Sequence, residues 1–314
     1  MNSSSKWQDL PTEAINPASL AIDKASSADI VDLMIAEDRK VVSAIRRERE
    51  RITIATDLIT ESLSKGGRLL FVGAGTSGRL GVLEAAEMLP TFGTSSNLVQ
   101  AIMAGGRTAF FQSREELDDR YEGGLRAVAR AQPTKRDVII GISASGMTPF
   151  VRGGLTRARK AGAKTIFVTC WPGTELQTYV DVTIAPSVGA EIIAGSTRLK
   201  AGTATKMVLN MLTTIPMVKL GKTYGNLMVD AQGTSQKHRD RARRILALVT
   251  DLEYSQADVL LRRARWNIKA AIVMQKTGET YTKAMRRLKK AGGAVRKAIN
   301  EDAEGRLRSR LNSQ

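Results

Sequence analysis

Residues 68–80 read Arg68-Leu-Leu-Phe-Val-Gly-Ala-Gly-Thr-Ser-Gly-Arg-Leu80. The apolar run predicts a buried strand, and the glycine-rich residues after it predict a turn that leads into a helix. A turn of this kind can direct backbone N–H groups at an anion, and the helix dipole favours negative charge there. Gly75, Thr76 and Ser77 are therefore candidate phosphate-binding residues. Glycine-rich turns after strands also occur in many α/β folds for packing alone, and that alternative stays open for this turn by itself.

A second turn rich in hydroxyl groups follows the apolar run Val138–Ile142. It carries Ser143, Ser145 and Thr148, followed by Pro149 and a helical stretch. The alternative is a helix N-cap at Thr148, but a cap needs one hydroxyl group and this turn has three. Three hydroxyl groups suit the three oxygens of a phosphate. In one doubly wound sheet both turns would open on the carboxyl edge, where ligands bind.

The composition of the 314 residues is that of an ordinary globular protein, with 42% hydrophobic and 25% charged residues. A chain of this length forms one large domain or two modest ones. The single cysteine, Cys170, rules out an internal disulfide framework and is typical of a reducing cytosol. With one cysteine and one histidine, His238, a conventional zinc site is not expected. A Ser-His-Asp triad would have to use His238, which lies in a run of charged residues.

The N-terminus and the apolar runs bear on where the protein works. No apolar run is long enough to span a membrane, and the first residues lack the apolar core of a signal peptide. We therefore expect a cytoplasmic protein with no membrane association.

The formal net charge is +17, which would permit contact with nucleic acid. Aromatic residues make up only 4%, however, and the basic residues concentrate beyond residue 237 on amphipathic stretches. Such a run of charge is more often a solvated face than an interface. A nucleic-acid partner is therefore not the expected reading, and strongly salt-dependent retention on DNA would be needed to support it.

The middle of the chain alternates between strand and helix patterns. The predicted strands are Leu69–Val72, Leu98–Met103, Val138–Ile142, Thr165–Thr169 and Val182–Ile184, and the predicted helices between them are Gly78–Met88, Glu115–Ala131 and Pro149–Ala161. This alternation indicates an α/β fold with a parallel sheet that is covered on both faces.

The two ends of the chain are predicted to be helical. Residues 1–20 are polar and read as an arm, and Ala28–Lys65 carries helical apolar stripes. A long apolar helix is expected at Ala204–Leu220, and residues 221–233 read as a connector. Four basic helices follow: Arg241–Thr250, Ser255–Arg265, Ile268–Thr277 and Thr280–Ala291. The predicted organisation is thus an N-terminal arm with helices at 1–65, a sugar-phosphate-binding domain at 66–233 and a basic helical domain at 234–314.

Several motifs in order resemble those of one family. They are Gly-Ala-Gly-Thr-Ser-Gly-Arg-Leu-Gly at 73–81, Ser-Ala-Ser-Gly-Met-Thr-Pro at 143–149, Val-Gly-Ala-Glu at 188–191, Gly-Ser-Thr-Arg-Leu-Lys-Ala-Gly-Thr at 195–203 and Gly-Asn-Leu-Met-Val-Asp at 225–230. The chain resembles the N-acetylmuramic acid 6-phosphate etherases, which have the sugar isomerase (SIS) fold and are related to the glucokinase regulatory protein, over almost its whole length. The resemblance implies a doubly wound parallel sheet of about five strands flanked by helices, with N-terminal helices and a small C-terminal helical domain.

The resemblance also implies an activity. Etherases of this family cleave the lactyl ether of N-acetylmuramic acid 6-phosphate to N-acetylglucosamine 6-phosphate and D-lactate, by elimination and then addition of water, during cell-wall recycling. They work as homodimers and need no metal or organic cofactor. A base must remove the proton at C2, and an acid must protonate the departing lactate oxygen, so two carboxyl groups with different pKa values would serve.

The resemblance places the acid at Glu87, and Glu84 is then the solvated glutamate of the pair. The second family carboxylate is a glutamate, and its position here is Asp118, one methylene shorter. Glu115 and Glu116 are neighbouring candidates. A misplacement of about 1 Å can lower a rate roughly 10²-fold. Two readings therefore stay open: an etherase that uses Asp118 as its base, or a non-catalytic hexosamine 6-phosphate-binding regulatory protein on the same fold.

The remaining site residues are carried over from matching motifs. Ser77, Ser143, Ser145 and Thr148 are expected to bind the phosphate, and Glu191 and Lys200 are expected to contact the sugar, with a site across a dimer interface as one possibility. Cys170 is expected to be a small buried residue.

Overall fold

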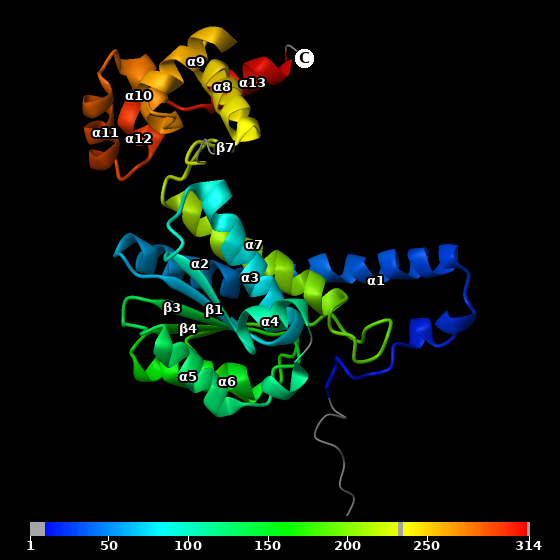
Figure 1. Ribbon diagram of the computed structural model, residues 1–314. Helices are drawn as coiled ribbons and strands as arrows, with labels where there is room; N and C mark the ends of the chain where they lie inside the picture. Colours follow the sequence, from blue (N-terminus) through cyan, green and yellow to red (C-terminus); the bar gives the residue numbers. More distant parts are fainter. Residues whose placement is uncertain (1–9, 113, 232–234, 313–314) are drawn as a thin grey trace, which may run out of the picture. The chain divides into compact units, whose positions relative to one another are not determined.

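The structure is a computed structural model that describes residues 10–112, 114–231 and 235–312 (Figure 1). It divides into two compact units. The first comprises Met1–Ala86 and Ser96–Thr213, and the second comprises Glu87–Ser95 and Thr214–Gln314. The division falls inside helices α3 (Gly75–Phe92) and α7 (Lys200–Lys219).

A five-stranded parallel sheet forms the centre of the first unit, in the order β2-β1-β3-β4-β5. The strands are β1 (Leu69–Gly73), β2 (Val99–Met103), β3 (Val138–Ile142), β4 (Lys164–Val168) and β5 (Val182–Ile184). Every residue of β1 and β3 is buried, which explains their unbroken apolar sequences. The predicted α/β class, the parallel sheet and the five strands are confirmed.

Helices cover both faces of this sheet. Helices α5 (Tyr121–Arg130) and α6 (Pro149–Lys160) pack together on one face, and α2 (Arg49–Ser64) covers the other (Figure 1). The backbones of α5 and α6 approach closely because a Cβ atom at Gly124 would lie 1.8 Å from the carbonyl oxygen of Phe150. Glycine at this position therefore fixes the spacing of the two helices.

The N-terminal helical region is interrupted once. Helix α1 (Ser27–Arg47) begins at a capping box formed by Ser26 and Asp29, and α2 follows after Glu48. The single helical stretch predicted at Ala28–Lys65 is thus two helices. Glu48 is left between them with a carboxylate that accepts a hydrogen bond from the backbone N–H of Ala185 at 3.1 Å.

The stretch predicted as one helix at Glu115–Ala131 is also divided. A 3₁₀ turn, η3 (Glu115–Leu117), comes first, and α5 begins only at Tyr121. Between them the carbonyl oxygen of Asp118 accepts a hydrogen bond from the N–H of Phe150 at 3.0 Å. Asp118 itself keeps right-handed helical backbone angles, and the break lies at Arg120, where φ is −87° and ψ is 89°.

Short elements complete the first unit. They are η1 (Pro17–Ser19), η2 (Ile22–Lys24), α4 (Gly106–Phe111) and η4 (Glu175–Thr178). The described part of the predicted N-terminal arm, residues 10–20, therefore contains the 3₁₀ turn η1, and η2 follows it. Residues 1–9 lie outside the described residues.

The second unit is mainly helical and carries its own apolar core, which confirms the predicted helical C-terminal part. Its helices are α8 (Gln236–Thr250), α9 (Tyr254–Arg263), α10 (Ile268–Thr277), α11 (Tyr281–Lys290), α12 (Val295–Ile299) and α13 (Glu304–Asn312). Leu246, Leu261 and Ile272 are completely buried in this core. The predicted connector contains a short hairpin, β6 (Thr223–Tyr224) and β7 (Leu227–Met228), because Tyr224 is anchored in the same core.

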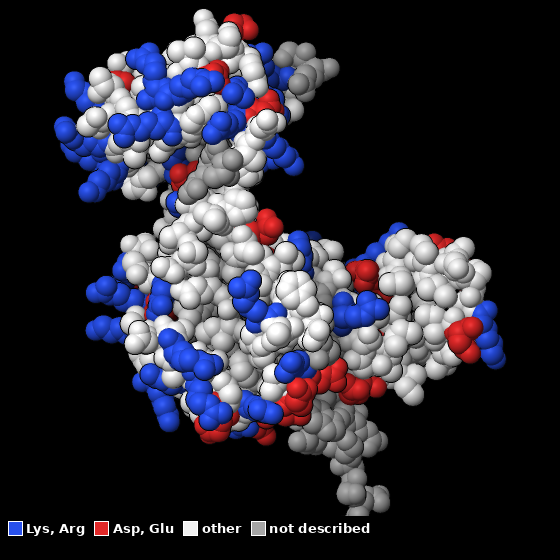
Figure 2. All heavy atoms as spheres, in the orientation of Figure 1, with Lys and Arg blue, Asp and Glu red and all other residues white. Residues whose placement is uncertain are grey.

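The surface of the second unit is strongly basic. Lys and Arg side chains cover much of its visible face in Figure 2. Several are paired, for example Arg287 with Glu279 and Arg243 with Asp258. Among the described helices, none has both the length and the apolar character that crossing a membrane requires.

Candidate functional site at the carboxyl edge of the sheet

The two turns predicted to bind phosphate lie side by side. They follow β1 and β3, which are neighbours in the sheet and end in register at Gly73 and Ile142. In the order β2-β1-β3-β4-β5, the chain leaves β1 toward one side of the sheet and β3 toward the other. A crevice outside the carboxyl ends of such strands is where doubly wound sheets bind ligands.

The first turn is built tightly around glycines. Gly75 has φ = 50°, a conformation that favours glycine, and it begins α3. A Cβ atom at Gly78 would lie 2.8 Å from Cγ of Met103, so the start of α3 packs directly on the end of β2. Thr76 lies next to the first turn of α7, since a Cβ atom at Gly202 would come within 4.0 Å of its methyl group. Ser77 is partly exposed.

The second turn gathers its three hydroxyl groups. The Oγ atom of Ser143 lies 2.7 Å from Oγ1 of Thr148 and 3.5 Å from Oγ of Ser145. Ser143 also accepts a hydrogen bond from the N–H of Gly146 at 3.1 Å. Thr174 holds the turn from outside, because its hydroxyl group donates to the carbonyl oxygen of Gly146 at 2.7 Å. The cluster is therefore formed before any ligand arrives.

Thr148 occupies the N-cap position of α6, with Pro149 at the first helical position, but its side chain makes no cap hydrogen bond. Its hydroxyl group is directed to Ser143 instead. Thr148 is thus the N-cap residue by its position, but its side chain does not cap the helix. Of the N–H groups in the first turn of α6, those of Phe150 and Arg152 donate to the carbonyl oxygens of Asp118 and Thr148, and Pro149 has none. The three hydroxyl groups beside this helix end are therefore the donors that an anion would meet there.

Asp118 lies between the two turns. A Cβ atom placed on Gly75 would be 3.4 Å from Oδ2 of Asp118, so the carboxylate is beside the first turn. Its backbone carbonyl is bonded to Phe150 at the start of α6. The structure therefore brings Asp118 together with both the glycine-rich and the hydroxyl-rich turn, although each turn lies at least 25 residues away in the sequence.

The environment of Asp118 favours its protonated form. Burial raises the pKa of its carboxyl group from 3.8 to about 6, and the nearby charges of Glu115 and Asp119 act in the same direction. The positive charge of Arg79 opposes them. Arg79 is itself fixed, because its guanidinium group donates to the carbonyl oxygens of Phe110 at 2.9 Å and Ala109 at 2.8 Å. A carboxyl group with a pKa near 6 is well matched to proton transfer close to neutral pH.

The two glutamates of α3 have opposite surroundings. Glu84 is buried and accepts hydrogen bonds from Nδ2 of Asn210 at 2.6 Å and from the hydroxyl group of Thr213 at 2.5 Å. The interpretation of Glu84 as a solvated residue is wrong, because this face of α3 packs against α7. Glu87 is exposed. Its assignment as the acid stays a prediction.

Glu191 and Lys200 are both buried and have internal partners. Glu191 accepts hydrogen bonds from the N–H groups of Lys200 at 3.0 Å and Ala201 at 2.9 Å, and so caps the start of α7. The Nζ atom of Lys200 lies 2.5 Å from Glu37 on α1. Hydrogen bonds from Lys200 and Lys40 lower the pKa of Glu37 to about 2 despite the opposing effect of burial. Contact of Glu191 and Lys200 with a sugar stays a prediction.

Glu37, Arg79 and the α7 partners of Glu84 were not predicted from the sequence. A signal for Glu37 was present, since it lies three residues after Met34 and four before Val41 in the apolar pattern of α1. An acidic residue at an apolar position is expected to be buried, and a buried carboxylate needs a cationic partner. Cys170 is buried as predicted, and burial raises the pKa of its thiol group to about 12. Within the described residues, no three His, Cys, Asp or Glu side chains gather as metal ligands would.

Comparison with known proteins gives a consistent set of relatives. Residues 51–159 match the family profile of the glucokinase regulatory protein N-terminal SIS domain, and residues 123–215 match that of the SIS domain. The N-acetylmuramic acid 6-phosphate etherase of Picosynechococcus sp. is 48% identical over 95% of this chain and 99% of its own length. The etherases of Synechocystis sp. and Salinibacter ruber are each 48% identical, over 93% and 94% of this chain and 95% of their own lengths.

Proposed function

We propose that this chain, which belongs to the N-acetylmuramic acid 6-phosphate etherase family, is a carbon–oxygen lyase that converts N-acetylmuramic acid 6-phosphate to N-acetylglucosamine 6-phosphate and D-lactate in cell-wall recycling. The observation that carries the proposal is the position of Asp118. Its carboxyl group, with a pKa of about 6, lies beside one candidate phosphate turn, while its backbone is bonded to the helix that follows the other.

The phosphate is held by the two turns. Thr76, Ser77, Ser143, Ser145 and Thr148 supply hydroxyl groups, and Gly75 lets the backbone approach the ligand. Support comes from the hydroxyl cluster formed around Ser143 at the start of α6. A dianionic group at this edge would gain charge-assisted hydrogen bonds from both turns.

The reaction begins with the open-chain sugar, whose C1 aldehyde makes the proton at C2 acidic. Asp118, in its ionised form, takes that proton. The bond between C3 and the lactyl oxygen then breaks, and Glu87 gives the departing oxygen a proton, so that D-lactate leaves and a C2–C3 double bond remains. Water adds its hydroxyl group at C3 and a proton at C2. Each of these bond changes is accompanied by a proton transfer that a carboxyl group can perform, so the proposed mechanism uses two carboxyl groups and includes no metal or organic cofactor.

The active form is a homodimer. Support comes from α1, where Val31, Met34, Ile35 and Val42 are apolar and exposed, with Val31 at 54% and Val42 at 58%. A stripe of exposed apolar side chains along one helix is typical of a protein interface. We assign it to a second copy of this chain. The single free and buried Cys170 is consistent with a cytoplasmic location.

The test is release of D-lactate from N-acetylmuramic acid 6-phosphate by the wild type and by Glu87→Gln, Asp118→Asn and Asp118→Glu. We expect release by the wild type and a loss of roughly 10²-fold or more in the first two variants. Failure of the wild type, with release by Asp118→Glu, would identify a hexosamine 6-phosphate-binding regulatory protein instead. Unchanged release by Asp118→Asn would remove Asp118 from the mechanism.

A further inference from the structure

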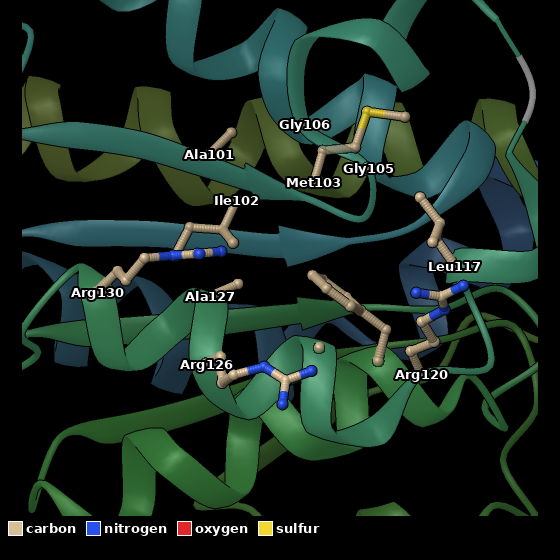
Figure 3. A pocket seen from close by; sticks show the side chains of 12 residues that line it. Ala101, Ile102, Met103, Gly105, Gly106, Leu117, Arg120, Arg126, Ala127 and Arg130 are labelled. Carbon is tan, nitrogen blue, oxygen red and sulfur yellow. The ribbon is translucent and has the colours of Figure 1, made fainter.

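A pocket that is not lined by the residues assigned to the sugar phosphate lies between strand β2 and helix α5. It has a volume of about 580 Å³. Figure 3 shows Ala101, Ile102 and Met103 on one side of it and Arg126 and Ala127 on the other. None of the residues of the two turns predicted to bind phosphate lines this pocket. A pocket of this volume is within the usual range for small-molecule sites.

Three arginine side chains line the pocket, and no acidic residue does. Arg126 and Arg130 are one helical turn apart on α5, and Arg120 immediately precedes that helix. In Figure 3 the side chain of Arg130 reaches across toward Ile102. Like charges at this spacing repel one another. Among the residues that the structure describes, no hydrogen bond or ion pair is made by any of the three guanidinium groups.

The rest of the lining is apolar. Ile102, Leu117, Ala127 and Phe150 are contributed by β2, η3, α5 and α6. The pocket therefore offers two kinds of surface at once, a wall suited to a carbon skeleton and guanidinium groups suited to an anion. Arginine binds phosphate oxygens in a bidentate manner, so the guanidinium groups favour a phosphate over a neutral ligand.

We propose that this pocket binds a small organic phosphate, with the phosphate held by Arg126 and Arg130 and the carbon skeleton placed against Ile102 and Ala127. The negative charge of the phosphate relieves the repulsion between the arginines. The proposed contacts with the ligand use none of the residues assigned to the lyase reaction.

The experiment uses phenyl phosphate as the probe, since it joins a phosphate to an apolar ring and contains no sugar. Its binding is measured by calorimetry on the full chain with the double substitution Ser143→Ala/Ser145→Ala, which weakens the other anion site. Added to this background, Arg126→Ala/Arg130→Ala is expected to weaken binding about tenfold or more. Alanine is the best helix former, so α5 is retained.

The matched control is Arg152→Ala, which removes an exposed arginine from α6 outside the pocket and is expected to leave binding unchanged. Arg126→Lys/Arg130→Lys keeps the charge and should weaken binding less than the alanine pair. Phenol, which lacks the phosphate, should bind more weakly than phenyl phosphate. The proposal is overturned if the alanine pair binds phenyl phosphate as well as the Arg152→Ala control does, or if phenol binds equally well.

Discussion

At the scale of single residues, Asp118 carries a linkage between pH and stability. Its pKa is raised from 3.8 to about 6 on folding, so the folded protein holds this proton more tightly than the unfolded chain. The contribution of this group to the free energy of unfolding therefore falls as the pH rises from about 4 to about 6. Asp118→Asn, which stays neutral, should melt at a higher temperature than the wild type at pH 7.5.

Thermal unfolding followed by circular dichroism checks this expectation. The difference between Asp118→Asn and the wild type should shrink toward about pH 4, where Asp118 is protonated in the folded protein. An Asp118→Asn variant that melts below the wild type at pH 7.5 would contradict it. The same ionisation should appear in catalysis, where kcat/KM is expected to rise with pH through about 6 because the base must be ionised.

Glu84 and Glu87 form a matched pair on one helix. Glu84→Ala leaves Asn210 and Thr213 without their carboxylate partner in a buried place, which should lower the free energy of unfolding by about 1–3 kcal/mol. Glu87→Ala removes an exposed side chain and should change it by less than about 0.5 kcal/mol. Urea denaturation measures both changes in the free energy of unfolding. An equal loss in the two variants would contradict the assignment of Glu84 as the buried glutamate and Glu87 as the exposed one.

At the scale of elements, the strands were predictable from the sequence because buried parallel strands are nearly continuous apolar runs. Each predicted strand end agrees with the structure to within one residue. The helix breaks at Glu48 and at Arg120 were not predictable, because near each of them the chain contacts a distant backbone group, that of Ala185 at Glu48 and that of Phe150 at Asp118. Periodicity reports which face of a helix is apolar and contains no information about such contacts.

The ion pair between α1 and α7 is the most buried charge contact described above. The pKa of Glu37 is lowered to about 2, so its contribution to stability is present above about pH 4.5 and is lost as the pH falls through about 2. Removing one partner leaves a buried charge, and Lys200→Met should lower the free energy of unfolding by about 3–5 kcal/mol.

The double variant Glu37→Met/Lys200→Met provides the control for that prediction. It removes both charges and fills the space with apolar side chains, so it should recover much of the stability lost in Lys200→Met. Chemical denaturation of the single and double variants completes a double-mutant cycle. A direct interaction would be contradicted if the double variant lost at least as much free energy of unfolding as the two single variants lost together.

At the scale of the whole molecule, the candidate site could be located from the sequence, but the arrangement of its residues could not. Residues Ser143, Ser145 and Thr148 are predictable because the carboxyl ends of adjacent parallel strands meet at one edge. The placement of Asp118 beside Gly75 follows from packing of η3 and α6, which no local pattern records. The division of the chain at residues 65 and 233 stays a prediction.

The proposed homodimer is tested on the same scale. Val31→Asp/Ile35→Asp places two carboxylates on the exposed stripe of α1 and should convert the dimer to a monomer in analytical ultracentrifugation. The control is Val259→Asp on α9, which also replaces an exposed valine, at 58%, and should leave the dimer intact. A wild type that sediments as a monomer would contradict the assignment.

The hydrogen bond from the N–H of Phe150 to the carbonyl of Asp118 has a consequence for how substrates are distinguished. In the proposed mechanism it joins the base Asp118 to the start of the helix that follows the second phosphate turn, so the non-reacting end of the sugar helps to set the position of the base. Binding energy gained far from the scissile bond is then used for alignment at that bond. In the proposed reaction, a sugar that lacks the 6-phosphate would turn over more slowly even at saturation, so discrimination would fall on kcat as well as on KM.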